Sequence, residues 1–220
     1  VGSEMCIRDW IPDWVTRKGD GSLVSDNTLY RNIFDHISSV AGRYSGKIKG
    51  WDVVNEAILD DGSYRENDFY KISADEYIFK SFEIAHKIDP NAELYYNDFS
   101  MYKPEKCDAA IRIANKILER GLRIDGIGLQ AHWGLDYPSI DEIETSILKI
   151  HEAGFRVHFT ELDIDVLPNL WEIEGADLSD NFKSNDQLNP YKSSLPDSIS
   201  DLLSDRYTEI FELFDKHNDK

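Results

Sequence analysis

Hydrophobic and polar positions along the chain follow two alternating periods, and each change of period marks a predicted element. Apolar residues that recur every three to four positions indicate amphipathic helices, because they form one stripe on a helix surface. Short apolar runs rich in β-branched and aromatic residues indicate strands. The pattern predicts helices over residues 27–43, 73–88, 104–120, 139–154 and 197–217, and strands over residues 48–54, 93–97, 125–132 and 156–164.

Two of these helices carry a start signal. Ser73 with Glu76, and Ser139 with Glu142, have the S-x-x-E spacing of a capping box. In this motif the serine and glutamate side chains bind free amide groups of the first turn. We therefore expect helices to begin directly after Ser73 and Ser139.

The order of the elements favours a parallel sheet covered by helices, since strand and helix alternate along the chain. No G-x-G-x-x-G or Walker sequence is present, so a (β/α)8 barrel fits better than a nucleotide-binding sheet. Such barrels usually have eight strands and ~250 residues. The predicted fold class is therefore α/β, an incomplete (β/α)8 TIM barrel with about four to five of the eight strands.

The chain divides into two predicted parts. Residues 1–9 (VGSEMCIRD) lack the charged start and the apolar run of a secretory signal, and they resemble a translated sequencing adapter. We therefore expect a non-native leader there. Residues 10–220 are expected to form one partial catalytic barrel, with a long loop over residues 168–197, which are rich in Asn, Asp, Ser and Pro.

Composition narrows the possible partners. The 24 Lys and Arg residues are scattered and face 42 Asp and Glu, so the formal charge of −18 argues against nucleic acid. No run of 18 apolar residues occurs, which argues against a membrane span. Cys6 and Cys107 are the two cysteines, too few for a disulfide framework or a thiol-rich metal site. The aromatic content of 12% suits a neutral, hydroxyl-rich ligand such as a sugar.

Polar side chains gather where three of the predicted strands end, which is where barrel enzymes build their active sites. They are Asn55 and Glu56 after the first strand, Gln130 and His132 after the third, and Glu161 and Asp163 after the fourth. The two-residue period of a strand places Glu161 and Asp163 on one face. His158 takes the opposite face, where we expect it to pack under a helix.

Two carboxylates at neighbouring strand ends meet the requirement of glycoside hydrolysis. One protonates the leaving oxygen, and the other attacks the sugar or activates water; a separation of ~5–5.5 Å predicts retention and ~6.5–9.5 Å inversion. The acid needs a raised pKa, and the partner needs hydrogen bonds that keep it ionised. His132 and Asp163 are placed to supply those bonds.

Simpler interpretations exist for each residue alone. Glu56 has the position of a helix cap or a surface acid, and His132 that of a hydrogen-bonded interior histidine. Trp133 and Tyr137 are as compatible with a core as with a sugar platform. A divalent-metal hydrolase could use His132, Glu161, Asp163 and His158. The strand period puts His158 on the wrong face, and no H-x-H or H-E-x-x-H pattern occurs.

Several segments resemble one known family, the retaining endo-β-1,4-xylanases of glycoside hydrolase family ten. They are WDVVNEAI (51–58), DDGSYR (60–65), AELYYNDF (92–99), IDGIGLQAHW (124–133), TELDI (160–164), NPY (189–191) and LPD (195–197). All occur in the family's order, from about Pro12 to the C-terminus. The resemblance implies endo-1,4-β-xylanase activity on xylan and xylo-oligosaccharides.

The resemblance also implies roles for individual residues. Glu56 is expected to be the general acid/base and Glu161 the nucleophile that forms a glycosyl-enzyme. Asn55 is expected to bind the 2-hydroxyl of the transferred sugar, and Gln130 to orient the acid/base.

The same resemblance extends to the surroundings of the nucleophile. His132 is expected to bridge Glu161 and Asp163. Further residues expected to shape the cleft are Asn97, Trp133 and Tyr137.

The chain also departs from the family. Its first strands, with a Glu-Asn pair, a lysine and a Trp-His pair that hold sugars, have no counterpart here, and neither has the eighth strand. Phe99 and Ser100 stand where the family usually has Tyr and Asn, which removes a hydroxyl and an amide from the leaving-group side. We expect the 220 residues alone to be poorly active or inactive, because open sheet edges remain and substrate clamps are missing.

Other functions stay open. A cellulase or mannanase on a related barrel also places an Asn-Glu pair at a strand end, although Ala57 replaces the usual proline of that motif. An inactive, truncated sugar-binding remnant is the second alternative. We expect no cofactor or metal, a monomer when complete, and a secreted or extracytoplasmic protein, because a polymer is too large to import.

Overall fold

A computed structural model describes residues 12–167, 190–191 and 193–220 of the chain. The leader expected at residues 1–9 lies outside these residues. So does most of the long loop expected over residues 168–197, together with Asn189 of the NPY motif.

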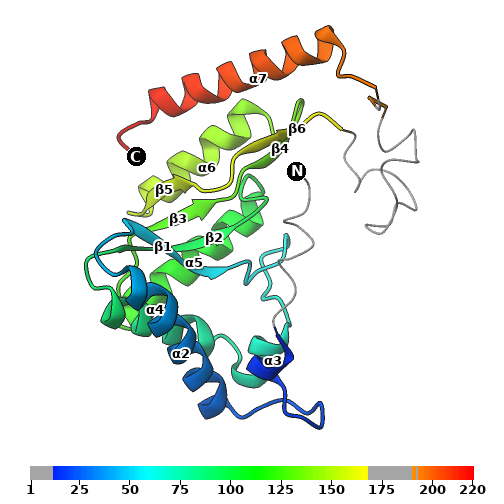
Figure 1. The fold of residues 1–220 in the computed structure, drawn as a ribbon. Helices are drawn as coiled ribbons and strands as arrows, with labels where there is room; N and C mark the ends of the chain where they lie inside the picture. Colours follow the sequence, from blue (N-terminus) through cyan, green and yellow to red (C-terminus); the bar gives the residue numbers. More distant parts are fainter. Residues whose placement is uncertain (1–11, 168–189, 192) are drawn as a thin grey trace.

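The core of the fold is a parallel four-stranded sheet of order β1-β2-β3-β5, with a parallel two-stranded sheet, β4-β6, beyond it. The strands are β1 (Gly50–Asn55), β2 (Glu93–Asp98), β3 (Gly126–Leu129), β4 (His132–Gly134), β5 (Arg156–Phe159) and β6 (Asp163–Asp165). Within the four-stranded sheet, each strand is joined to the next by a connection that contains at least one helix, as the alternating pattern predicts (Figure 1).

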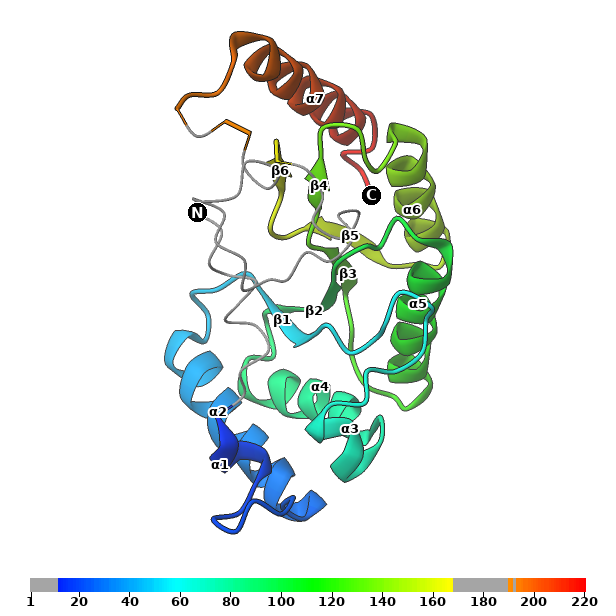
Figure 2. The ribbon, with the colours of Figure 1, turned by 90° about the vertical axis from the view of Figure 1, so that its right-hand side faces the viewer.

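Helices cover one side of this sheet and form its outer layer (Figure 2). The long helices are α2 (Asp26–Tyr44), α4 (Glu76–Ile88), α5 (Pro104–Glu119), α6 (Ile140–Glu152) and α7 (Asp197–Lys216), and the short ones are α1 (Asp13–Thr16) and α3 (Asp68–Ser73). Of these, α4 contacts β1 and β2, α5 contacts β3, and α6 contacts β5. The structure therefore confirms the predicted class, an α/β wall of an incomplete (β/α)8 barrel. None of the described helices is both long and apolar enough to cross a membrane.

Apolar side chains fill the space between sheet and helices. Fully buried members of this core are Leu29, Ile58, Ile78, Phe82, Leu94, Tyr96, Ile113, Ile117 and Ile127. Burying one such large side chain contributes about 1.5–3 kcal/mol, so this layer supplies the main stabilisation of the wall.

One of the two predicted capping boxes is confirmed. The Ser139 hydroxyl accepts a hydrogen bond from the Glu142 amide (3.3 Å), and the Glu142 carboxylate accepts one from the Ser139 amide (2.8 Å). The other box is wrong, because Ser73 ends α3 and its hydroxyl donates to the Phe69 carbonyl (3.2 Å). The next helix, α4, begins only at Glu76.

The wrong box has a tertiary cause. Ala74 has a positive φ of 49°, which separates α3 from α4. The Glu76 carboxylate, which the box requires, instead accepts from Nη1 (2.8 Å) and Nη2 (2.6 Å) of Arg120. A pattern read along the chain misses partners that lie far away in sequence.

Two predicted strands are each interrupted. β3 and β4 divide the run predicted over residues 125–132, and β5 and β6 divide the run over residues 156–164. Ala131 adopts a positive φ of 63° at the first break. Glu161 lies in the second break, where its amide donates to the Gln130 carbonyl (3.1 Å). The alternation of side chains between the two faces of a strand is therefore lost across both breaks. Backbone hydrogen bonds between the two segments continue there.

A buried carboxylate ties the ends of two helices to the first strand. Asp89 is 1% exposed and accepts from the Trp51 indole (3.1 Å), the Ser45 hydroxyl (3.0 Å) and the Gly46 amide (3.3 Å). Burial opposes the ionised form, but these hydrogen bonds outweigh it, so the pKa of Asp89 is lowered. The α2–β1 turn thus depends on one ionised side chain.

We predict that Asp89→Asn lowers the free energy of unfolding by about 1–3 kcal/mol, because the amide cannot accept all three bonds. Urea unfolding followed by fluorescence and circular dichroism measures this loss. Since the lowered pKa makes the contribution present above the ordinary value of 3.8, the difference between the two proteins should shrink as the pH falls below that value. Asp20→Asn, at an exposed turn, is the control and should change stability by less than about 0.5 kcal/mol. Equal losses in both variants would contradict the proposed tie.

Candidate active site

The carboxyl ends of the strands bring the predicted polar residues together. The register pairs Asn55 of β1 with Asn97 of β2, and Asn97 with Gly128 of β3. Beyond β3 and β5 the chain pairs His132 of β4 with Asp163 of β6 (Figure 2). Residues from these five strands therefore meet at one rim of the wall.

Glu56 is held by a buried amide. Its Oε1 atom accepts from Nε2 of Gln130 at 2.9 Å, and the same nitrogen donates to Oδ1 of Asn55 at 3.0 Å. Gln130 is fully buried, so its side chain has little freedom to turn away. This arrangement orients the Glu56 carboxylate, as predicted for Gln130.

Glu161 is held by a second buried amide. Nδ2 of Asn97 donates to Oε1 of Glu161 (3.0 Å) and to Oδ1 of Asn55 (3.1 Å), while Oδ1 of Asn97 accepts from the Thr160 hydroxyl (2.9 Å). Both ends of the Asn97 amide are therefore occupied, which fixes its orientation. One continuous chain of hydrogen bonds, through Gln130, Asn55 and Asn97, joins Glu56 to Glu161.

His132 holds the other oxygen of Glu161. Its Nε2 lies 3.2 Å from Oε2 of Glu161, and its Nδ1 lies 2.8 Å from Oδ1 of Asp163. The ring thus bridges the two acids, as the resemblance implies, and fixes the direction of the second Glu161 oxygen.

Two residues expected to shape the cleft, Trp133 and Tyr137, pack against other parts of the protein. Trp133 is 4% exposed and packs edge-on against Phe159 in a second core beneath α6 and α7, at 5.8 Å between ring centroids. This burial favours the packing interpretation of Trp133 over a sugar platform. Tyr137 is partly buried and its ring covers Gly134, so close that a side chain at that glycine would collide with it.

His158 corrects the face prediction. Its side chain is exposed on the inner face of the wall, and its ring lies 5.1 Å from that of Tyr95, not under a helix. Glu161 turns back to the same face because β5 ends at Phe159, before the two-residue period can carry Glu161 away. Neighbouring protein on that face raises the pKa of Asp52 by displacing water; His158 opposes the rise and Glu161 adds to it.

Two site residues were missed by the sequence reading. The Thr160 hydroxyl fixes the Asn97 amide. Gly128 leaves room for it, since a Cβ there would lie 2.5 Å from Oδ1 of Asn97 and 3.1 Å from Cγ2 of Thr160. A glycine inside an apolar strand is a signal of such close approach.

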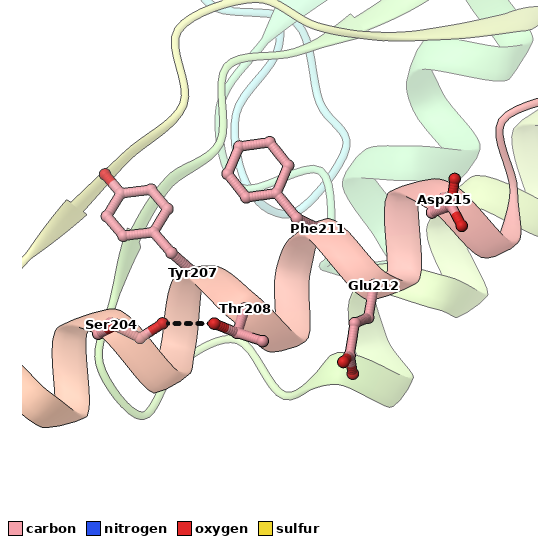
Figure 3. A pocket seen from close by; sticks show the side chains of 6 residues that line it. All are labelled: Ser204, Tyr207, Thr208, Phe211, Glu212 and Asp215. Atoms are coloured by element: carbon pink, nitrogen blue, oxygen red, sulfur yellow. Dashed lines mark hydrogen bonds between the residues drawn. The ribbon is translucent and has the colours of Figure 1, made fainter.

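The lining of one hollow includes none of these carboxylates. The hollow is open, has a volume of about 660 Å³ and follows one face of α7 (Figure 3). It is lined by Ser204, Tyr207, Thr208, Phe211, Glu212 and Asp215. Among the described residues, no group of three or more His, Cys, Asp or Glu is arranged to hold a metal ion.

A parallel barrel wall with two hydrogen-bonded carboxylates at its strand ends defines the class of barrel glycoside hydrolases. The sequence profile of the family described as glycosyl hydrolase family 10 matches residues 2–216. The chain therefore belongs to glycosyl hydrolase family 10, which confirms the resemblance.

Relatives and solved structures agree with this assignment. The chain is 42% identical over 208 residues to endo-1,4-beta-xylanase A of Xylanibacter ruminicola, covering 94% of this chain and 56% of that protein. It is 34% identical to an endo-1,4-beta-xylanase of Geobacillus stearothermophilus, covering 99% of this chain and 62% of that protein. A GH10 endoxylanase retrieved from sugarcane soil metagenome superposes with a TM-score of 0.86 at 39% identity, covering 96% of this chain and 60% of that one. The chain thus spans about 60% of the length of these proteins.

We predict that Gly128→Ala lowers the free energy of unfolding by about 1–3 kcal/mol, because the added methyl group overpacks the space beside Asn97. Urea unfolding measures the loss. Gly19→Ala is the matched control, since a Cβ at Gly19 meets nothing within 4 Å. A Gly128→Ala protein as stable as the Gly19→Ala protein would show that this space is not tight.

Proposed function

We propose that this chain is the central part of an endo-1,4-β-xylanase that cleaves internal bonds of xylan with retention of configuration. The observation that carries the proposal is the hydrogen-bond chain that holds Glu56 and Glu161 through three amides. The names of the relatives support xylan as the substrate.

In the first step, one oxygen of Glu161 attacks the anomeric carbon while Glu56 gives its proton to the leaving glycosidic oxygen. Glu161 is suited to attack because Asn97 donates to one of its oxygens and His132 faces the other. The bond to the leaving sugar breaks and a glycosyl-enzyme ester forms.

In the second step, Glu56 takes a proton from water, which attacks the same carbon and releases Glu161. Asn55 is the candidate for binding the 2-hydroxyl of the sugar. Its Oδ1 already accepts from Gln130 and Asn97, so the amide group at its other end is the one directed to a ligand.

The remaining parts of the proposal concern the complete protein. It acts on xylan and xylo-oligosaccharides as a monomer, without a cofactor, and it is secreted or extracytoplasmic because the polymer lies outside the cell. A cellulase or mannanase, or a sugar-binding remnant without turnover, are the alternatives that the following measurements separate.

We expect the purified chain to be weakly active at most, as the missing substrate clamps imply, and to release what reducing sugar it does from xylan and not from carboxymethylcellulose or mannan. Glu161→Ala removes the attacking oxygen, so it should reduce release to the level of a blank. Reducing-end assays on the three polymers measure both effects. Preferred cleavage of carboxymethylcellulose or mannan would replace the xylanase assignment.

Trapping with 2,4-dinitrophenyl 2-deoxy-2-fluoro-β-xylobioside tests the nucleophile separately. The activated leaving group needs no proton, and the fluorine slows hydrolysis of the ester, so one turnover per molecule is enough for detection. We expect a mass gain of one glycosyl unit on the peptide that contains Glu161, and none in Glu161→Gln. Label on any other carboxylate would refute the assigned role.

A further inference from the structure

A second buried network lies behind the active site, on the helix side of β2. Tyr96, Asp98 and Lys106 are each 0% exposed. The Tyr96 hydroxyl donates to Oδ2 of Asp98 at 2.6 Å, and Nζ of Lys106 lies 2.9 Å from Oδ1. A tyrosine, an aspartate and a lysine thus form one chain inside the protein.

The buried charges in this chain are fully accommodated. Lys106 also reaches Oδ1 of Asp60 (3.2 Å) and lies 3.4 Å from the centre of the Phe99 ring, which attracts a cation. The Phe99 amide donates to Oδ1 of Asp98 at 2.9 Å. Burial raises the pKa of Asp98, and the Lys106 charge opposes that rise. A buried ion pair with so many satisfied partners specifies geometry more than it adds stability.

The chain ends on the backbone of the acid/base segment. The Tyr96 hydroxyl accepts from the Ala57 amide at 3.1 Å. Burial and the nearby Asp98 charge raise the pKa of Tyr96, so its single proton stays on the oxygen and is donated to Asp98. The lone pairs of the hydroxyl are therefore left for Ala57.

Glu56 needs this support because its backbone is strained. Its φ is +57°, in the left-handed region, which costs a non-glycine residue about 1–2 kcal/mol. The Asn97 carbonyl accepts from the Glu56 amide (3.0 Å), and the Arg65 guanidinium donates to the Glu56 carbonyl (3.0 Å). The Tyr96 hydroxyl binds the next peptide group by accepting from the Ala57 amide.

Asp98 also binds Gln130, the partner of Glu56. The Asp98 backbone carbonyl accepts from the Gln130 backbone amide at 3.0 Å, so Asp98 also positions the residue that orients Glu56. Asp98 therefore acts on both partners of the hydrogen bond between the Gln130 side-chain amide and the Glu56 carboxylate. It holds the Gln130 backbone directly, and it holds the Glu56 segment through Tyr96.

We propose that Tyr96, Asp98 and Lys106 are positioning residues for Glu56: the buried ion pair fixes the Tyr96 hydroxyl, which holds the Ala57 amide and keeps the Glu56 carboxylate on Nε2 of Gln130. This inference rests on the proposed role of Glu56 as acid/base. Tyr96 touches neither substrate nor reacting atoms and acts only through the backbone.

The chain contains a matched control for this triad. The Tyr64 hydroxyl donates to Oδ2 of Asp75 (3.0 Å), and Lys116 lies 3.1 Å from the same atom. Tyr64→Phe therefore removes the same hydroxyl from the same kind of tyrosine–aspartate–lysine cluster, but one without a bond to the Ala57 amide. It serves as the reference for Tyr96→Phe in every measurement below.

The first measurement needs no enzymatic activity, and it begins with the unaltered chain. Backbone amide hydrogen exchange in the unaltered chain should show Ala57 protected to the level of the β2 amides, although Ala57 lies outside β1. In Tyr96→Phe we expect that protection to fall at least about tenfold, and the Gln130 side-chain amide resonance to move. Tyr64→Phe should leave both unchanged. Rapid exchange of Ala57 in the unaltered chain overturns the proposal even where Tyr96→Phe fails to fold.

The second measurement separates positioning from mere stability. Misplacement of the acid should lower kcat/KM for xylotetraose about tenfold in Tyr96→Phe. It should lower kcat/KM for 2,4-dinitrophenyl β-xylobioside less than about twofold, because that leaving group needs no proton. Tyr64→Phe should change neither value by more than about twofold. Equal losses on both substrates overturn the proposal, since a structural defect reduces both.

The two measurements also keep this inference distinct from the proposed function. Failure of fluoroxylobioside to label Glu161 counts against the glycosidase assignment. Unchanged Ala57 exchange in Tyr96→Phe counts against the positioning role, whatever the outcome of labelling.

Discussion

The Asn97 side chain is the constraint on which the site depends. One amide joins Asn55 on one neighbouring strand to Glu161 on the far side of β3, and its carbonyl is fixed by Thr160. This works only because β1, β2 and β3 keep a parallel register that places Asn55, Asn97 and Gly128 in one row. The distance between the two halves of the site is therefore set by the sheet and not by flexible loops.

The helix-side network extends that constraint behind the sheet. Residues 96–98 alternate between the two faces of β2, so Asn97 faces the site while Tyr96 and Asp98 face the helices. A single short strand thus holds Glu161 by one side chain and the segment of Glu56 and Ala57 by the two beside it. Because side chains alternate along β2, the positions of Glu56 and Glu161 both depend on this one strand.

Much of the fold and most of the site could be predicted from sequence, because their signals are local. The period of apolar residues indicated each long helix, and strand ends indicated where Glu56, Gln130 and Glu161 converge. The errors have tertiary causes. The Glu76 carboxylate binds Arg120, so no capping box forms at Ser73. β5 stops at Phe159, so His158 and Glu161 share a face, and Trp133 is buried by α6 and α7, which pattern alone does not place.

The two strand breaks determine how Glu161 and Gln130 are retained in the wall. Glu161 and Gln130 lie in the seam between the four-stranded and the two-stranded sheets, where their peptide groups bond to neighbouring segments and not within one regular strand. Such residues cannot fray independently, since each is retained by a segment distant in sequence. Local opening at Glu161 or Gln130 therefore requires neighbouring segments of the wall to separate as well. The rigidity of these two positions follows the cooperative unfolding of the whole sheet.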